Sequence, residues 1–145
     1  MRRPRLSIVL FALACLAASG ASAQSADPTG RWKTIDDETG NVKSIVEITE
    51  SGGKLRGQVV EILQSDRGPD PACDQCKGAN KGKPVKGMTI LWDLARDGSE
   101  WKGGTILDPS NGKTYRSKLK MIDAGKLGVS GCVAFICREQ VWVRE

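Results

Sequence analysis

Apolar and polar residues alternate along much of the chain after residue 30. The clearest case is the segment 113–122, where Tyr115, Ser117, Leu119 and Met121 are separated by Thr, Arg and Lys residues. A period of two predicts a β-strand with one face toward the protein interior and the other toward water. No segment after residue 24 keeps a helical period over three turns, so the pattern predicts an all-β fold.

Residues that form tight turns recur about every dozen positions, a spacing typical of all-β sandwiches and barrels. Gly, Asn and Asp are frequent there because such turns require a positive φ or a side chain that bonds its own backbone. The turns lie at 36–41, 51–53, 97–98, 108–112 and 123–125. They separate eight predicted strands, at 31–36, 42–50, 54–63, 87–94, 100–107, 113–122, 126–132 and 139–144.

Eight short antiparallel strands joined by hairpins leave two exposed edges unless the sheet closes on itself. Closure predicts a small antiparallel up-and-down β-barrel, whose interior has room for packed side chains or for one small ligand. Within 54–63 the apolar phase changes at Val59 and Val60, which predicts a β-bulge. The residues expected to face the barrel interior are Trp92, Gly103, Tyr115, Ser117, Leu119 and Met121.

The first 23 residues have the organisation of a secretory signal peptide. Three Arg residues precede an apolar run at 6–18, and small residues follow up to Ala23. This pattern predicts cleavage after Ala23 and a periplasmic or secreted protein with one domain, 24–145. A membrane anchor is disfavoured because it requires about 20 apolar residues, more than the run at 6–18 provides. Lipidation at Cys15 is disfavoured because the expected Leu three positions earlier is missing. The mature chain holds no second run long enough to span a bilayer.

Cleavage changes the charge of the protein. The chain has 22 Lys and Arg against 17 Asp and Glu, and the signal peptide takes three Arg and no acid with it. The net charge falls from +5 to +2, and this excess lies in the segment 64–86, with five basic and three acidic residues. A short basic row at Arg116, Lys118 and Lys120 is typical of a solvated strand face, so we expect no nucleic-acid partner.

The chemistry available to the chain is limited by the absence of His. Ser-His-Asp and Cys-His catalysis and His-rich zinc sites are excluded. The acidic cluster at 36–38 lacks the spacing of a Ca²⁺ loop, and no motif singles out a carboxylate pair for hydrolysis. We therefore assign no catalytic residue, metal ligand or cofactor, and expect a protein that is not an enzyme.

The four Cys residues of the mature chain allow several arrangements. Cys73 with Cys76 and Cys132 with Cys137 form two local pairs in sequence, and two local disulfides would suit an oxidising compartment. Crossed pairings are also possible. The C-x-x-C pair would otherwise serve a thiol-disulfide enzyme, or all four thiols would hold a structural zinc ion.

Two sets of residues resemble known families. The opening Gly30-Arg31-Trp32 resembles the G-x-W motif of lipocalins, in which a Trp on the first strand plugs the closed barrel end and an Arg from the last strand lies against it. The resemblance implies that Gly30, Trp32, Trp142 and Arg144 form the closed end.

A second set of motifs runs along nearly the whole mature chain. It consists of W-K-T-I-D at 32–36, C-x-x-C at 73–76, K-P at 83–84, Gly87, W-K-G-G at 101–104, I-L-D-P at 106–109, N-G-K-T-Y at 111–115, G-C at 131–132 and C-R-x-Q-x-W-x-R at 137–144. In order and spacing these motifs resemble the secreted bacterial family known as domain of unknown function 2147, over residues 30–144. The resemblance implies a lipocalin-like barrel and carries no established activity or ligand.

The sequence therefore predicts a barrel that binds a small apolar or amphipathic molecule at its mouth. The candidate ligand-binding residues are the aromatics Trp92, Trp101 and Tyr115, together with Met121, because a pocket needs rigid apolar walls and few polar groups. An alternative is an envelope-accessory protein with a filled interior, which meets another protein or an anionic polymer through the loop 64–86. A thiol-disulfide enzyme using Cys73 and Cys76 is the third hypothesis.

Overall fold

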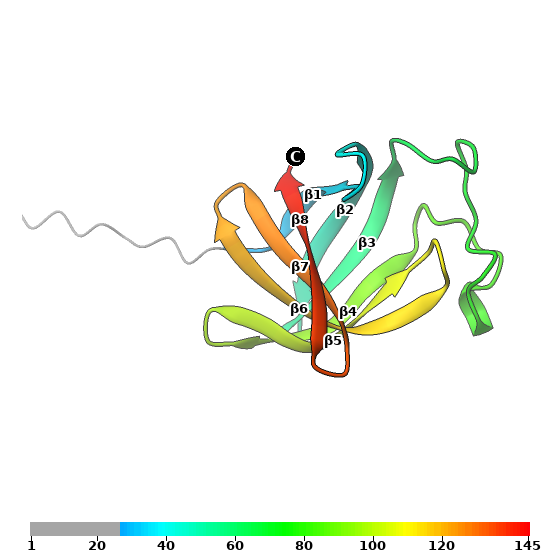
Figure 1. The fold of residues 1–145 in the computed structure, drawn as a ribbon. Helices are drawn as coiled ribbons and strands as arrows, with labels where there is room; N and C mark the ends of the chain where they lie inside the picture. The colour runs from blue at the N-terminus through cyan, green and yellow to red at the C-terminus, as the bar shows by residue number, and fades with distance from the viewer. Residues whose placement is uncertain (1–26) are drawn as a thin grey trace, which may run out of the picture.

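Eight antiparallel strands close into a barrel in the computed structural model, which describes residues 27–145 (Figure 1). Each strand pairs with the next, and β8 pairs with β1 to complete the closure. The predicted signal peptide lies outside the described residues. The strands are β1 (Gly30–Ile35), β2 (Val42–Ser51), β3 (Lys54–Ile62), β4 (Thr89–Asp97), β5 (Glu100–Asp108), β6 (Lys113–Asp123), β7 (Lys126–Val133) and β8 (Ile136–Arg144).

The up-and-down connectivity places alternate connections at opposite ends of the barrel. The β1–β2, β5–β6 and β7–β8 connections and the long loop 63–88 share one end, which we call the mouth. The β2–β3, β4–β5 and β6–β7 turns and the start of β1 share the other, closed end. The only helix in the described part of the chain is the short 3-10 turn Gly78–Asn80 in loop 63–88. No helix among these residues is long and apolar enough to cross a membrane.

The predicted bulge in β3 is confirmed. Ile45 of β2 lies opposite Glu61, while the next residue, Val46, lies opposite Val59. Val60 therefore has no partner, and the inward face changes phase at this point, as the apolar pattern indicates. Val59 is buried and Val60 is half-buried.

Two predicted strand boundaries were wrong by three residues, and the predicted start of β4 at 87 was two residues too early. β8 begins at Ile136 instead of 139, because Cys132 and Cys137 are themselves opposite residues of the β7–β8 ladder and pairing continues to Val133 and Ile136. β4 continues to Asp97 instead of ending at 94. Asp93 has a φ of 61°, which breaks the alternation without ending the strand.

Gly103 was wrongly expected inside the barrel. Its φ is +76° and a Cβ built on it meets open space, whereas a Cβ on Gly104 would lie 2.5 Å from the Cγ of Leu94. The register of β5 against β6 shifts between Trp101 and Gly104. This irregularity moves the alternation by one position, so that Gly104 faces the core. Leu119 and Ser117, as expected, are buried.

The closed end is organised around Trp32 and Arg144. Trp32 is fully buried, its indole nitrogen donates to the Pro28 carbonyl at 2.8 Å, and the Arg144 guanidinium lies 4.1 Å from its ring centroid. Gly30 has a φ of +113°, and a Cβ there would be 3.0 Å from an Arg144 nitrogen. The guanidinium donates three hydrogen bonds to backbone carbonyl oxygens, those of Thr29 at 3.0 Å, Asp27 at 2.8 Å and Ala124 at 2.9 Å.

Loop 63–88 is folded rather than extended. Cys73 and Cys76 form a disulfide and are both buried in the hydrophobic core. The Cys73 N–H donates to the Lys83 carbonyl oxygen at 2.8 Å, and the Val85 N–H donates to the Pro71 carbonyl oxygen at 2.9 Å. These bonds close the central part of the loop on itself, so its lack of apolar periodicity reflects a fold held by a covalent bond and turns.

Candidate functional site: a cavity at the barrel mouth

A cavity of about 850 Å³ opens at the mouth of the barrel. Its walls come from the inward faces of several strands and from loop 63–88, so no single segment of sequence defines it. The apolar side chains of its inner walls include Val59, Ile62, Val85, Ile90, Ile106, Leu107, Val129 and Trp142. A concave, mostly apolar surface of this size is typical of a site for one small molecule.

The deepest part of the cavity is formed by Trp142 and Gln140. Of the β8 residues that line the cavity, Trp142 is nearest the closed end, and its side chain is buried. Its indole nitrogen donates to the Gln140 Oε1 atom at 2.7 Å. This bond orients the Gln140 amide and leaves its NH₂ group without a partner among the described residues, so it is available as a donor toward the cavity.

Hydroxyl groups closer to the mouth add hydrogen-bonding groups to the cavity lining. The hydroxyl oxygens of Thr34 and Ser44 lie 2.8 Å apart on β1 and β2. Tyr115 lines the cavity, and its hydroxyl accepts a hydrogen bond from the Asn111 side chain at 3.1 Å. The same Asn111 amide donates to Asp108 at 3.0 Å, so the β5–β6 turn fixes the position of the tyrosine hydroxyl.

Charged groups of both signs occupy the rim. Arg138 pairs with Asp37 at 3.2 Å, and Lys43 lies 3.8 Å from Asp36. Hydrogen bonds from the Thr39 backbone and hydroxyl, with a smaller contribution from Lys43, hold the pKa of Asp36 below its ordinary value. The charged side chains of the rim therefore form a polar edge above an apolar interior.

Loop 63–88 supplies part of this rim. Arg67, whose guanidinium donates to the Ala72 carbonyl at 2.6 Å, lines the cavity together with Asp66 and Pro71. Counted over the whole lining, four Asp and three Lys or Arg residues are present. The rim is close to neutral, and no strong preference for a charged ligand follows from it.

The four candidate ligand residues lie in different places. Tyr115 alone among them lines the cavity. Trp101 is buried in the core with the Arg96 guanidinium 4.7 Å from its ring centroid, and Met121 packs against the core from the partly buried face of β6. Trp92 is partly buried against the core and lines a groove outside the barrel.

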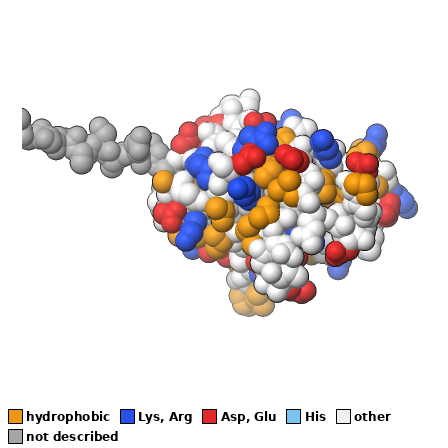
Figure 2. Space-filling view, turned by 90° about the horizontal axis from the view of Figure 1, so that it is seen from above, with side chains coloured by type: hydrophobic (Ala, Val, Ile, Leu, Met, Phe, Trp, Pro, Cys, Tyr) orange, Lys and Arg blue, Asp and Glu red, His pale blue; other side chains and the backbone are white. Residues whose placement is uncertain are grey.

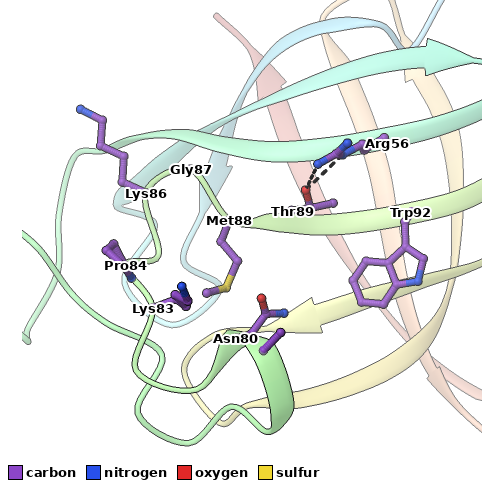
Figure 3. Close-up of a pocket in the computed structure, with 10 residues that line it drawn as sticks. Arg56, Asn80, Lys83, Pro84, Lys86, Gly87, Met88, Thr89 and Trp92 are labelled. Atoms are coloured by element: carbon purple, nitrogen blue, oxygen red, sulfur yellow. Dashed lines mark hydrogen bonds between the residues drawn. The ribbon is translucent and has the colours of Figure 1, made fainter.

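That outer groove lies between β3, β4 and loop 63–88 (Figure 3). Trp92 and Met88 supply its apolar surface. Arg56, Lys83 and Lys86 line it, and no acidic residue of the described chain does. Arg56 donates two hydrogen bonds to the Thr89 hydroxyl, at 3.1 and 2.6 Å, which hold its guanidinium along the groove.

The cysteines form the two local disulfides, Cys73–Cys76 and Cys132–Cys137. All four sulfur atoms are used, so neither the crossed pairings nor a Cys₄ zinc site is present in this structure. Cys73 has no exposed surface. A redox motif needs an accessible thiol of lowered pKa, and this burial therefore argues against the thiol-disulfide enzyme.

The sequence did not assign Trp142 or Gln140 to the ligand site. The resemblance to lipocalins instead implied that Trp142 belongs to the closed end. The usable signal was the alternation in β8, which puts Arg138, Gln140, Trp142 and Arg144 on one face. Once the barrel direction is known, that face runs from the mouth to the closed end.

The fold and the cavity can be compared with known proteins. One solved structure, a protein from the human pathogen Helicobacter pylori described as belonging to the lipocalin family, is similar, with a TM-score of 0.70 and 21% sequence identity over 83% of this chain and 84% of that one. At this identity the similarity shows the fold, a lipocalin-like barrel. Among curated proteins, no sequence matches the chain. The family model described as "uncharacterized protein conserved in bacteria" matches residues 30–144, and the chain therefore belongs to this family, DUF2147.

Proposed function

We propose that this protein is an exported, non-catalytic binding protein that holds one small amphipathic molecule in the mouth of its barrel. The observation that carries the proposal is the cavity of about 850 Å³, with apolar walls inside and a polar rim. An apolar tail would lie against Trp142 and the aliphatic walls, and a polar head would meet the groups at the rim. The lipocalin-like fold supports this reading.

Export is supported by chemistry that does not depend on the signal peptide. Two disulfides persist in oxidising compartments such as the periplasm and are rare in the cytosol. The non-catalytic role is supported by the composition of the cavity. It holds no thiol and no His, and three of its four Asp side chains, those of Asp36, Asp37 and Asp108, are engaged at the rim in ion pairs or turns.

The proposal can be tested by displacement of a hydrophobic dye. The mature protein should bind 1-N-phenylnaphthylamine with a rise in fluorescence, and medium-chain fatty acids should displace the dye. Native mass spectrometry of protein purified from its own host should show an added small molecule. Absence of dye uptake together with a ligand-free mass would reject the proposal.

A cavity-filling variant makes this test specific. Gly131 lines the cavity, and a Cβ there meets only ordinary contacts, 3.5 Å from Ile106 and Tyr115. Gly131→Leu should therefore fold and occupy ligand space, weakening dye binding at least about tenfold, which corresponds to ~1.4 kcal/mol. Gly125→Leu is the matched control, because Gly125 lies in the β6–β7 turn at the closed end and a Cβ there meets only a side-chain oxygen at 3.6 Å.

A second candidate function is recognition of an anionic polymer or an acidic segment of an envelope protein. The observation that favours it is the outer groove, with three basic side chains and no acidic one among the described residues. Binding of dextran sulfate should then fall in Lys83→Gln/Lys86→Gln and persist in the control Lys113→Gln/Lys126→Gln. Equal binding by the two double variants would reject this candidate.

A further inference from the structure

The most exposed apolar side chains of the described chain are gathered at one point. Val133, Phe135 and Ile136 are 65%, 92% and 70% exposed and lie at the tip of the β7–β8 hairpin. With Ala134 they form a four-residue segment, which we call the apolar tip. The tip projects from the barrel in Figure 1, between the ends of β7 and β8. Figure 2 shows one face of the molecule, on which hydrophobic side chains lie among charged side chains of both signs.

The tip is held in this exposed position by its local structure. The Cys132–Cys137 disulfide joins the two strands directly behind it, and backbone pairing continues to Val133 and Ile136. Only Ala134 and Phe135 remain to make the turn. Ala134 accepts a φ of 53°, a conformation unusual for a residue with a Cβ. This hairpin cannot fold back to bury Phe135 without breaking its own ladder.

The tip is continuous with the cavity. Val133 and Ile136 line the cavity at its rim. A molecule that leaves the cavity on this side therefore passes directly over apolar surface. Phe135, two residues after Val133 and directly before Ile136, extends the same surface outward.

Basic side chains lie beside the tip. Arg116 on β6 is directly opposite Cys132, and Lys113 lies three residues further toward the same rim. Neither forms an ion pair with the described residues. Of the acidic residues nearby, Asp37 pairs with Arg138 at 3.2 Å and Glu139 with Lys120 at 3.0 Å. Asp108, opposite Lys113, accepts hydrogen bonds from the side chains of Ser110 and Asn111 in its own turn. The surroundings of the tip therefore offer unpaired positive charge.

We propose that the apolar tip inserts into the surface of an anionic lipid bilayer and sets the cavity mouth against it. Insertion of this kind strengthens with buried apolar area and with attraction between basic side chains and anionic headgroups. The proposal rests on the proposed function, since an amphipathic ligand would then pass between the bilayer and the cavity without crossing water. A convex tip of four residues is too small for a stable protein interface, which takes about 20 residues a side, whereas a fluid bilayer can surround it.

Co-sedimentation of the mature, disulfide-bonded protein with vesicles tests the proposal. Wild type should bind vesicles of phosphatidylglycerol and phosphatidylethanolamine, bind phosphatidylcholine vesicles less, and lose affinity as salt is raised. Phe135→Ser/Ile136→Ser should lower the partition coefficient at least about tenfold on anionic vesicles. The matched control is Leu63→Ser/Ile122→Ser, which removes apolar residues that are 47% and 46% exposed elsewhere and should bind as wild type does.

The charge contribution has its own variant. Lys113→Gln/Arg116→Gln should weaken binding to anionic vesicles only and should abolish the salt dependence. Equal binding by wild type and the tip variant would overturn the proposal. So would a concentration-dependent dimer in the absence of vesicles that the tip variant loses, because the tip would then be covered by a second copy.

Dye binding separates this proposal from the function on which it rests. The single variant Phe135→Ser changes the most exposed residue of the tip, which does not line the cavity, so its affinity for 1-N-phenylnaphthylamine should stay within about twofold of wild type. A wild type that takes up the dye and ignores every vesicle would refute membrane insertion and leave the ligand-binding proposal standing. Failure of dye uptake with intact vesicle binding would do the reverse.

Discussion

The closed end of the barrel depends on one guanidinium group, and replacing it tests how the fold is held. Arg144→Met keeps an unbranched apolar stem but removes every donor of the side chain. Three hydrogen bonds to backbone carbonyls are lost, together with the stacking of the guanidinium on the Trp32 ring at 4.1 Å. The carbonyl oxygens belong to the segment before β1 and to the β6–β7 turn, so the substitution detaches two connections at once.

The size of the effect follows from the exposure of each contact. The partly buried bond to Thr29 is a hydrogen bond from a charged group, worth about 1.5 kcal/mol. The two exposed bonds contribute about 0.5 kcal/mol each, and stacking on a buried indole adds about 1 kcal/mol. Arg144→Met should therefore lower the free energy of unfolding by about 3.5 kcal/mol and the midpoint of thermal unfolding by about 10 °C.

Thermal unfolding followed by near-ultraviolet circular dichroism measures this change and reports on the Trp32 environment directly. The unfolding midpoint of Arg144→Lys should lie between those of wild type and Arg144→Met, since Lys keeps the charge but cannot donate to all three carbonyl oxygens. Arg138→Met is the control. Its guanidinium pairs only with Asp37, its side chain is 77% exposed, and its loss should cost under about 1 kcal/mol. A midpoint for Arg144→Met within 3 °C of wild type would refute the reasoning.

Further predictions concern other positions. Gly112→Ala should loosen loop 63–88, because Gly112 has a φ of +69° and a Cβ there would lie 2.1 Å from a carbonyl oxygen of that loop; limited proteolysis should then cut the loop faster than in wild type. Gly104→Ala should lower the free energy of unfolding by about 1–3 kcal/mol through overpacking, seen as a lower urea midpoint with an unchanged m-value. Asp36 has a lowered pKa because Thr39 donates to its carboxylate, so its support for the β1–β2 turn is present above the ordinary carboxyl pKa and lost as the pH falls through the lowered one. Amide exchange in this turn should therefore accelerate relative to the rest of the barrel on acidification, and Asp36→Asn should remove the pH dependence.

The strands could be predicted from sequence because each has one buried and one solvent-exposed face, which produces alternating apolar and polar residues. Ser117 and Leu119 are buried as the pattern predicts, and the phase change at Val60 marks a real bulge. The pattern failed where the backbone departs from regular β geometry. Asp93 and Gly103 have positive φ values. The alternation of apolar and polar side chains does not indicate the backbone conformation at either position.

The cavity was harder to predict for a different reason. Its lining comes from many strands, and a residue faces it only if its strand position, register and depth all agree. Tyr115 satisfies these conditions. Trp101 is buried, but it packs into the core and does not line the cavity. Trp92 lies directly before Asp93, whose φ is positive, and lines the outer groove. Aromatic character identifies residues able to form a pocket, while register across eight strands decides which of them do.

The two ends of the barrel are held by different chemistry, and the difference bears on function. The closed end is joined by the contacts of Arg144 to Trp32 and nearby carbonyls, while both disulfides lie at the mouth. Each disulfide closes a loop of only a few residues and so adds at most about 2 kcal/mol to the stability of the whole domain. Their larger effect is local. They restrain loop 63–88 and the β7–β8 hairpin, both of which border the cavity, and connections already ordered lose less entropy when a ligand binds. The disulfides therefore preorganise the part of the barrel that a ligand must pass.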